Sequence, residues 1–225
     1  MFSMLAEIEL PDLAVSTPLW LSLVTVFVNA VVGALRGYAD ESRQWDIVGV
    51  SAFALLMGLG GGFIRDLLIG NLPAESLRSP WYIATVAGGV IIVLLIGKRV
   101  ALIQPVMDFL NAVAMGLFAV TGVAHARELD LPFVSSLLIG TLSAVGGGVL
   151  VSVLQGRIPS VLLVGAPHAL LAFWGSVTYA TVAIWNTAAA SVAGIAVVIL
   201  AQYLVDHLEV RTRPAHRWRI PKWGE

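Results

Sequence analysis

The stretch MGLGGGFIRDLLIG, residues 57–70, places three consecutive glycines and an Arg-Asp pair inside a strongly apolar segment. On a helix Gly60, Gly61 and Gly62 point in three directions about 100° apart, so one packing seam cannot use all of them. They also lower the helix propensity by about 1 kcal/mol each relative to alanine. The triplet therefore predicts a local helix break whose backbone groups face water rather than lipid. Close helix packing by small residues is the alternative interpretation.

The triplet recurs 86 residues later, and so do the glycine and the proline that follow it. The recurring residues are Gly146, Gly147, Gly148, Gly156 and Pro159. Each copy spans three apolar segments, and an odd number of crossings inverts the second copy relative to the first. Inverted repeats with discontinuous helices are typical of transport proteins, whose binding or permeation site lies near the midplane at the repeat interface.

The charged pair Arg65 and Asp66 has no second copy, because Val151 and Ser152 occupy the equivalent positions. Charges at this depth in a membrane are costly unless they are paired or hydrated. Two interpretations stay open: a charged pore mouth, or a clasp that binds backbone groups freed by the broken helix. Of the two residues, Arg65 is the better candidate for acting on ion entry, because its charge does not titrate.

Further polar residues within or near the apolar segments are candidates for lining a pore. They are Asn29, Asn111, Asp108 and Ser143. Asn29 and Asn111 occupy similar places in the two copies, and cross-helix hydrogen bonds explain them equally well. His168 follows a proline near a span end, a position more typical of a hydrogen-bonded structural histidine than of a proton sensor.

The elements that must position these residues are membrane helices. The chain is 58% hydrophobic and 12% charged, whereas soluble domains are about 25% charged. Seven segments have roughly the 20 apolar residues that a crossing needs. They are residues 18–37, 47–69, 81–97, 105–124, 133–155, 161–184 and 187–207. We expect an all-α polytopic protein with a single transmembrane domain over residues 1–225.

Within this domain, repeat one covers about 18–97, repeat two about 105–184, the seventh helix about 187–207 and a basic tail 208–225. The second and fifth helices are predicted to be broken at the glycine triplets. With the N-terminus outside, ten Lys and Arg residues fall on the inner side and three on the outer side. The positive-inside rule therefore predicts an outer N-terminus and a cytoplasmic C-terminus.

Several classes of function find no support in the sequence. The chain has no cysteine and a net charge of −1, so thiolate metal sites and a basic nucleic-acid surface are not expected. No metalloprotease, nucleotide-binding or nucleophile-elbow motif is present, which argues against an enzyme. We expect no cofactor, and no metal beyond transient K+ or Na+.

The motifs together resemble the prokaryotic trimeric intracellular cation (TRIC) channel family over nearly the whole chain. They are Asp46, GLGGGFIRDLLIGNLP, PWY at 80–82, FAVTG at 118–122 and the second GGG followed by GRIP. The resemblance implies a homotrimer with one K+-conducting pore per protomer, less selective for Na+, around helices two and five bent at Gly60–Gly62 and Gly146–Gly148. Membrane lipids are then expected at the trimer interface.

A passive monovalent cation channel in the plasma membrane of a bacterium or archaeon is thus the leading hypothesis. The alternative is a secondary transporter of a small zwitterion such as glycine, because the same domain is labelled a glycine transporter in some bacterial relatives. Half-helix ends could hold a carboxylate and an ammonium group equally well.

Overall fold

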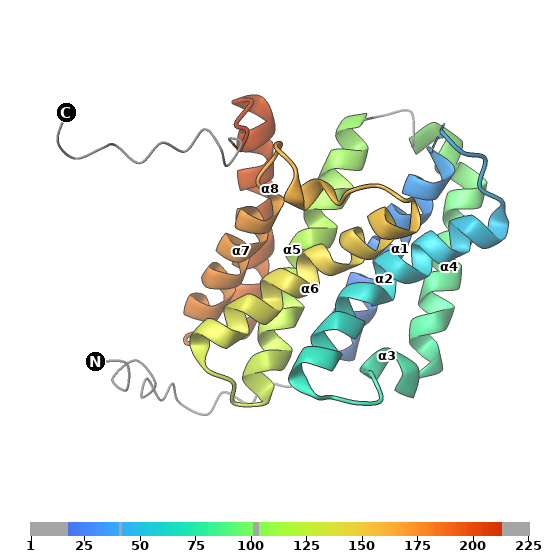
Figure 1. The fold of residues 1–225 in the computed structure, drawn as a ribbon. Coiled ribbons are helices and arrows are strands. Elements are labelled where there is room, and N and C mark those ends of the chain that lie inside the picture. The colour runs from blue at the N-terminus through green and yellow to red at the C-terminus, as the bar shows by residue number, and fades with distance from the viewer. Residues whose placement is uncertain (1–17, 41, 101–103, 213–225) are drawn as a thin grey trace, which may run out of the picture.

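A computed structural model describes residues 18–40, 42–100 and 104–212. The described residues form helices and no strand (Figure 1). The elements in chain order are α1 (Leu19–Tyr38), α2 (Ile47–Ile69), α3 (Glu75–Arg78), α4 (Pro80–Val100), α5 (Gln104–Glu128), α6 (Phe133–Leu154), the 3-10 turn η2 (Ser160–Leu162), α7 (His168–Val182) and α8 (Thr187–His207). Because the short α3 takes a number, the predicted fifth, sixth and seventh spans are α6, α7 and α8. Most of the predicted tail, residues 213–225, lies outside the described residues.

Six of the described helices are long and apolar enough to cross a membrane: α1, α2, α4, α5, α6 and α8. The seventh, α7, has 15 residues, or about 22 Å of helix. The predicted sixth span, 161–184, is therefore wrong at its start, since the helix begins only at His168. Pro167 precedes the helix as its N-cap, and the residue before a proline avoids helical conformations. Residues 160–162 form the η2 turn, and 163–167 form a loop.

The two halves of the chain are inverted relative to each other. In Figure 1, α1 and α4 run from the bottom of the view to the top, whereas α5 and α7 run from top to bottom. The second helix of each half ends in the same way: Gly70 follows α2 with φ 72° and Gly156 closes the turn after α6 with φ 66°. This left-handed conformation favours glycine, which explains why both positions carry it.

The glycine triplets do not interrupt their helices. Helix α2 runs from Ile47 to Ile69 and α6 from Phe133 to Leu154, each through its triplet. The predicted breaks in the second and fifth helices are therefore wrong for this conformation. Helix propensity is a weak preference that tertiary packing overrides, and these two helices pack against each other at the triplets.

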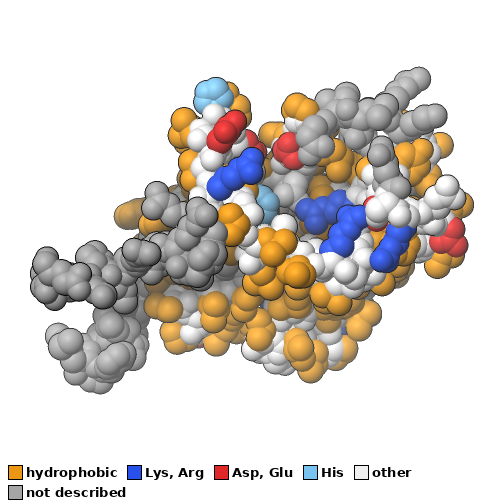
Figure 2. Space-filling model, turned by 45° about the horizontal axis from the view of Figure 1, so that its top comes forward, with side chains coloured by type: hydrophobic (Ala, Val, Ile, Leu, Met, Phe, Trp, Pro, Cys, Tyr) orange, Lys and Arg blue, Asp and Glu red, His pale blue; other side chains and the backbone are white. Residues whose placement is uncertain are grey.

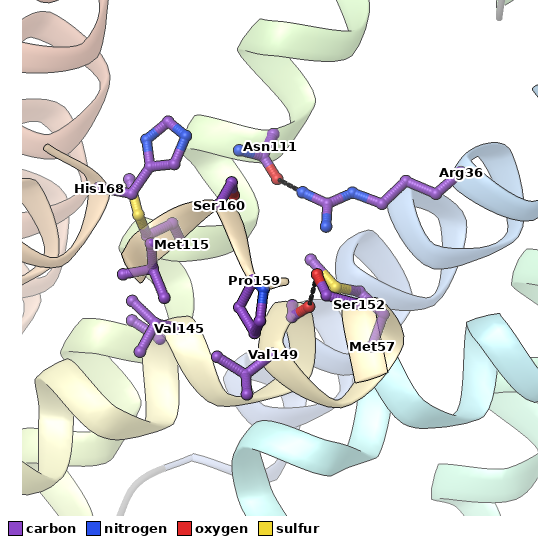
Figure 3. Close-up of a pocket in the computed structure, with 13 residues that line it drawn as sticks. Arg36, Met57, Asn111, Met115, Val145, Val149, Ser152, Pro159, Ser160 and His168 are labelled. Atoms are coloured by element: carbon purple, nitrogen blue, oxygen red, sulfur yellow. Dashed lines mark hydrogen bonds between the residues drawn. The ribbon is translucent and has the colours of Figure 1, made fainter. Parts of the chain in front are cut away.

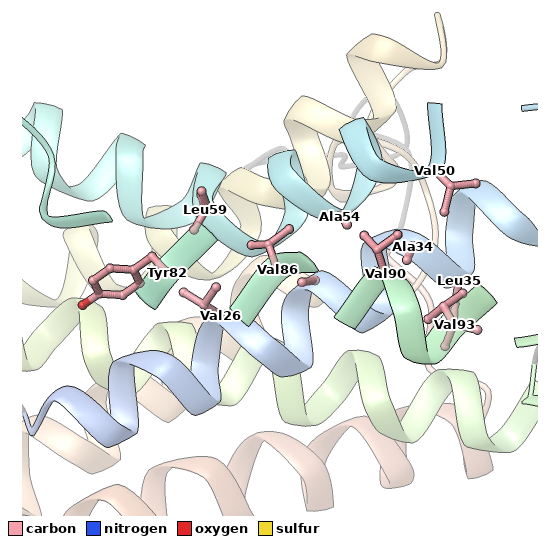
Figure 4. Close-up of a cluster of buried hydrophobic side chains, with 11 residues drawn as sticks. Val26, Ala34, Leu35, Val50, Ala54, Leu59, Tyr82, Val86, Val90 and Val93 are labelled. Atoms are coloured by element: carbon pink, nitrogen blue, oxygen red, sulfur yellow. The ribbon is translucent and has the colours of Figure 1, made fainter. Parts of the chain in front are cut away.

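Each half of the chain has a buried apolar cluster of its own. One joins α1, α2 and α4, and its members, shown in Figure 4, include Val26, Leu35, Val50, Leu59, Val86 and Val93. The other joins α5, α6, α7 and α8 through Phe118, Ala144, Leu171 and Val198. Large apolar side chains such as Val48, Leu95, Val134 and Val192 point outward and are more than half exposed, as expected where helices face lipid.

Candidate functional site

The centre of the molecule is the crossing of α2 and α6, where glycines of the two triplets replace side chains. A Cβ atom on Gly147 would lie 2.7 Å from the carbonyl oxygen of Met57, and one on Gly61 would overlap the carbonyl oxygen of Ser143. Met57 and Ser143 are themselves 86 residues apart. The contacts at the crossing thus repeat the internal symmetry of the sequence.

The first glycine of each triplet is equally confined. A Cβ on Gly60 would lie 2.6 Å from Leu150 Cδ1, and one on Gly146 would lie 2.5 Å from Ile64 Cδ1. Ile64 and Leu150 again differ by 86 positions. The first two glycines of each triplet therefore allow α2 and α6 to approach closely, which is the packing role that the sequence left as the alternative.

The third glycine of each triplet faces open space. A Cβ on Gly62 would meet no atom within 4 Å, and one on Gly148 would meet only Arg36 Nη1, at 3.6 Å. Each of these glycines lines a cavity, Gly148 together with Arg36 and Gly62 together with Arg65. We call these the Arg36 cavity and the Arg65 cavity.

The Arg36 cavity measures about 40 Å³ and lies between α1, α2, α5, α6 and the segment that precedes α7 (Figure 3). Its polar lining residues are Arg36, Asn111, Ser152, Ser160 and His168. Arg36 Nη2 donates a hydrogen bond to Asn111 Oδ1 over 2.6 Å, and Ser152 Oγ donates to the carbonyl oxygen of Gly148 over 2.8 Å.

A wider vestibule of about 580 Å³ adjoins this cavity, because Arg36, Ser152 and Ser160 line both. Figure 2 looks toward this end of the molecule, where several arginine side chains gather. Asp40, also in the vestibule wall, accepts hydrogen bonds from Trp45 Nε1 over 2.9 Å and from Arg157 Nη2 over 2.9 Å. Hydrogen bonds from Ser42 and Trp45 hold the pKa of Asp40 well below its usual range.

The Arg65 cavity measures about 20 Å³ and lies toward the opposite end, between α1, α2, α3, α4 and α5. Arg65 and Asp66 are 5% and 1% exposed, and Arg65 Nε donates to Asp66 Oδ1 over 2.8 Å. Arg65 Nη2 also donates to Glu75 Oε2 over 3.0 Å, and Asp66 Oδ2 accepts from the Glu75 backbone N–H over 2.8 Å. The pair therefore fastens α3 to α2 and at the same time forms a wall of the cavity.

Glu75 is the hub of this cluster. Its carboxylate also accepts hydrogen bonds from Tyr82 Oη over 2.6 Å and from His125 Nε2 over 2.8 Å. Burial raises the pKa of Glu75, but the hydrogen bonds from His125 and Tyr82 and the charges of His125 and Arg65 outweigh it and lower the pKa to about 2. The carboxylate thus ties α2, α4 and α5 to the short α3.

A buried apolar cluster packs beside the Arg36 cavity, and one of its members, Met57, also lines that cavity. It contains Val32, Phe53, Met57, Ala114 and Val151. On α1, Val32 lies between Val26, which lines the Arg65 cavity, and Arg36. The described residues therefore enclose two cavities at different depths along α1, and the two cavities share no lining residue.

The other predicted pore residues divide between packing and the cavities. Asn29 is 1% exposed and its Nδ2 donates to the carbonyl oxygens of Thr25, over 2.9 Å, and Ala114, over 3.1 Å. Ser143 is buried at the crossing, where its Oγ donates to the carbonyl oxygen of Gly61 over 3.2 Å. Asp108 is exposed near the start of α5 and does not line either cavity. Of these four residues, only Asn111 lines a cavity. The structure therefore gives Asn29 and Asn111 different surroundings.

Sequence reasoning missed three residues of this region. Arg36 was counted only as a charge that sets orientation, although it falls inside the first predicted span, where a charge is a signal of function. Glu75 and His125 are 50 residues apart and meet through Glu75 Oε2. No pattern in the sequence links them, because only the packing of α5 against the α3 segment brings them together.

The fold and the paired cavities define a multi-pass helical membrane protein built from two inverted repeats. A TRIC trimeric intracellular cation channel orthologue from Rhodobacter sphaeroides is similar over 85% of this chain and 98% of its own, with a TM-score of 0.74 and 25% identity. A prokaryotic TRIC channel crystallised in 0.5 M KCl is similar over 93% of this chain and all of its own, with a TM-score of 0.76 and 23% identity. These neighbours are channels and not enzymes, in agreement with the sequence.

The family described as "Glycine transporter" matches residues 19–98 and 108–184, and the chain belongs to that family. Each matched segment spans one of the two halves. Relatives include a UPF0126 membrane protein of Deinococcus radiodurans, 31% identical over 64% of this chain and 65% of its own length. Another is the UPF0126 membrane protein YvgT of Bacillus subtilis, 31% identical over 63% of this chain and 69% of its own length. The chain thus spans about two thirds of these curated relatives.

Proposed function

We propose that this protein is a channel for monovalent cations. The observation that carries the proposal is the pair of cavities that end on the third glycines of the two triplets, Gly62 and Gly148, on the tightly crossed helices α2 and α6. The similarity to solved TRIC channels supports the same function.

In this proposal each protomer carries its own pathway, from the vestibule through the Arg36 cavity and past the crossing of α2 and α6 to the Arg65 cavity. The conformation described here is closed between the two cavities, which share no lining residue. Neutral polar groups and backbone carbonyls can replace part of the hydration shell of K+ or Na+, whereas divalent cations hold their water more tightly. We propose that the protein assembles as a homotrimer, with lipids at the interface, as the name of its TRIC neighbour implies for that protein.

For the membrane, we propose the plasma membrane of a bacterium or archaeon with the C-terminus in the cytoplasm. The wide vestibule with Arg36 and Arg157 then faces the cytoplasm, as the positive-inside rule requires. Arg65 and Asp66 face the outer side, where they act as a clasp that also shapes the outer cavity.

Secondary transport of a small zwitterion such as glycine is the second candidate, favoured by the description of the matching family. The two functions differ in one measurable property. A channel passes K+ down its gradient, whereas a transporter saturates and exchanges bound substrate across the membrane.

The test is flux through the purified protein in liposomes. A K+ gradient should drive K+ flux, while labelled glycine should show neither saturable uptake nor counterflow. Saturable glycine uptake with counterflow, in the absence of K+ flux, would show that the protein is a glycine transporter and not a cation channel.

Matched leucine variants connect the flux to the proposed pathway. Gly62→Leu and Gly148→Leu fill the two cavities and should lower K+ flux about tenfold or more, since the width of a pathway controls passage. Gly88 on α4 also has no atom within 4 Å of a Cβ position but lines neither cavity, so Gly88→Leu should retain the flux. An equal loss of K+ flux in all three variants would show that the two cavities do not form the pathway.

A further inference from the structure

Arg36 places a permanent positive charge in the proposed cation pathway. Its guanidinium donates to the neutral Asn111 over 2.6 Å. Among the described residues no carboxylate lies within 4 Å of it, and the lining of the Arg36 cavity contains no Asp or Glu. Because arginine does not lose its proton in proteins, the charge needs a partner from outside this lining.

The neighbouring groups are also hydrogen-bond donors. Asn111 accepts from Arg36 through Oδ1, which leaves its Nδ2 group to donate. His168 Nδ1 is buried and has no hydrogen-bond partner among the described residues, and it donates in the tautomer that places the ring proton on Nδ1. Ser160, which lines both the cavity and the vestibule, adds a hydroxyl group. In Figure 3, Asn111 lies between Arg36 and His168, so these donors surround one space.

We infer that the Arg36 cavity binds a small anion, either an inorganic anion such as chloride or the carboxylate of a small molecule. The guanidinium and the Asn111 amide are its principal ligands, and Ser160 and His168 complete the donor set. A planar guanidinium with several N–H donors suits a carboxylate in particular. The cavity of about 40 Å³ has room for an occupant of a few heavy atoms, and the vestibule of about 580 Å³ gives access to it.

The consequence for transport rests on the proposed function. A bound anion neutralises Arg36 and removes a charge that would otherwise repel cations from the vestibule. The occupancy of the site would then set how readily K+ enters, whereas anion binding itself requires no flux.

Binding can be measured by thermal unfolding of the purified full-length protein in detergent. Chloride, acetate and glycine are each titrated against gluconate, a bulky anion, at constant ionic strength. A ligand that binds only the folded protein raises Tm in a saturable way. We expect such a rise with at least one of the three probes, and the pattern among them separates an inorganic anion from a carboxylate. If none of the three raises Tm above the gluconate reference, the inference is wrong.

Three variants locate the site. Arg36→Gln removes the charge and should weaken the response about tenfold or more, the size expected for a hydrogen-bonded charge. Asn111→Asp keeps the shape and supplies a carboxylate next to Arg36, so it should remain folded and abolish the response. Arg43→Gln removes an exposed arginine outside the cavity and should respond like the wild type.

The Asn111→Asp variant keeps the inference testable if Arg36→Gln fails to fold. An undiminished response in Asn111→Asp, or an equal loss in Arg43→Gln, would overturn it. Anion binding is measured by thermal unfolding and not by flux. The absence of an anion effect on Tm would therefore not bear on the proposed K+ flux, and the absence of K+ flux would not bear on anion binding. If both hold, K+ flux through Asn111→Asp should no longer depend on the anion present.

Discussion

Alanine substitution within the glycine triplets should separate helix packing from cavity lining. In Gly61→Ala the new methyl group overlaps the Ser143 carbonyl oxygen, and in Gly147→Ala it lies 2.7 Å from the Met57 carbonyl oxygen. Backbone atoms cannot rotate away, so α2 and α6 must move apart, at a cost of about 1–3 kcal/mol for overpacking. Gly62→Ala meets no atom within 4 Å and makes a matched control.

Each of these alanines also gains about 1 kcal/mol of helix propensity. This gain is common to all three variants and cancels in the comparison, which leaves the crossing variants about 1–3 kcal/mol less stable than Gly62→Ala. For a protein of this size the difference corresponds to about 2–12 °C in Tm.

Thermal unfolding in detergent, followed by circular dichroism, measures this difference. K+ flux in liposomes, measured alongside it, shows whether the parted helices still support transport. If Gly61→Ala and Gly147→Ala unfold at the same temperature as Gly62→Ala, the triplets are not a close crossing.

Three further predictions concern the ion pairs at the two ends of the bundle. Arg65→Gln should destabilise the protein by about 3–5 kcal/mol, because it leaves buried acidic partners unpaired. The control Arg78→Gln changes an exposed arginine and should cost less than about 1 kcal/mol. Equal losses of stability in thermal unfolding would show that Arg65 does not fasten α3 to α2. The pKa of Glu75 is lowered from 4.5 to about 2, so the stability that its carboxylate contributes is complete above about pH 4.5 and is lost as the pH falls toward 2. In this pH range the Tm of Glu75→Gln should therefore change less than the Tm of the wild type. Asp40→Asn weakens the hydrogen bond from Arg157 and should increase hydrogen exchange after α1 and α6, and unchanged exchange would argue against this contact.

Much of the architecture was predictable from local pattern. Apolar segments of membrane-spanning length fixed the helices, and the 86-residue repeat of GGG with its trailing glycine and proline indicated two inverted halves. The left-handed turns at Gly70 and Gly156 also follow from local sequence, because glycine adopts a positive φ far more readily than other residues. The short α7 was missed because composition continued apolar through Pro167, where the backbone could not continue as a helix.

The roles within the triplets depended on partners in another helix. The sequence by itself determined that the glycines are paired and lie in membrane-spanning segments, and it marked Arg65 and Asp66 as charges that need partners. Only the tertiary structure decided which glycines pack and which line cavities, and that Glu75 and Arg36 belong to those cavities. The reason is physical: what a missing side chain leaves room for, and which charge meets which, depends on how α2 crosses α6 and on what α1 and α5 place beside that crossing.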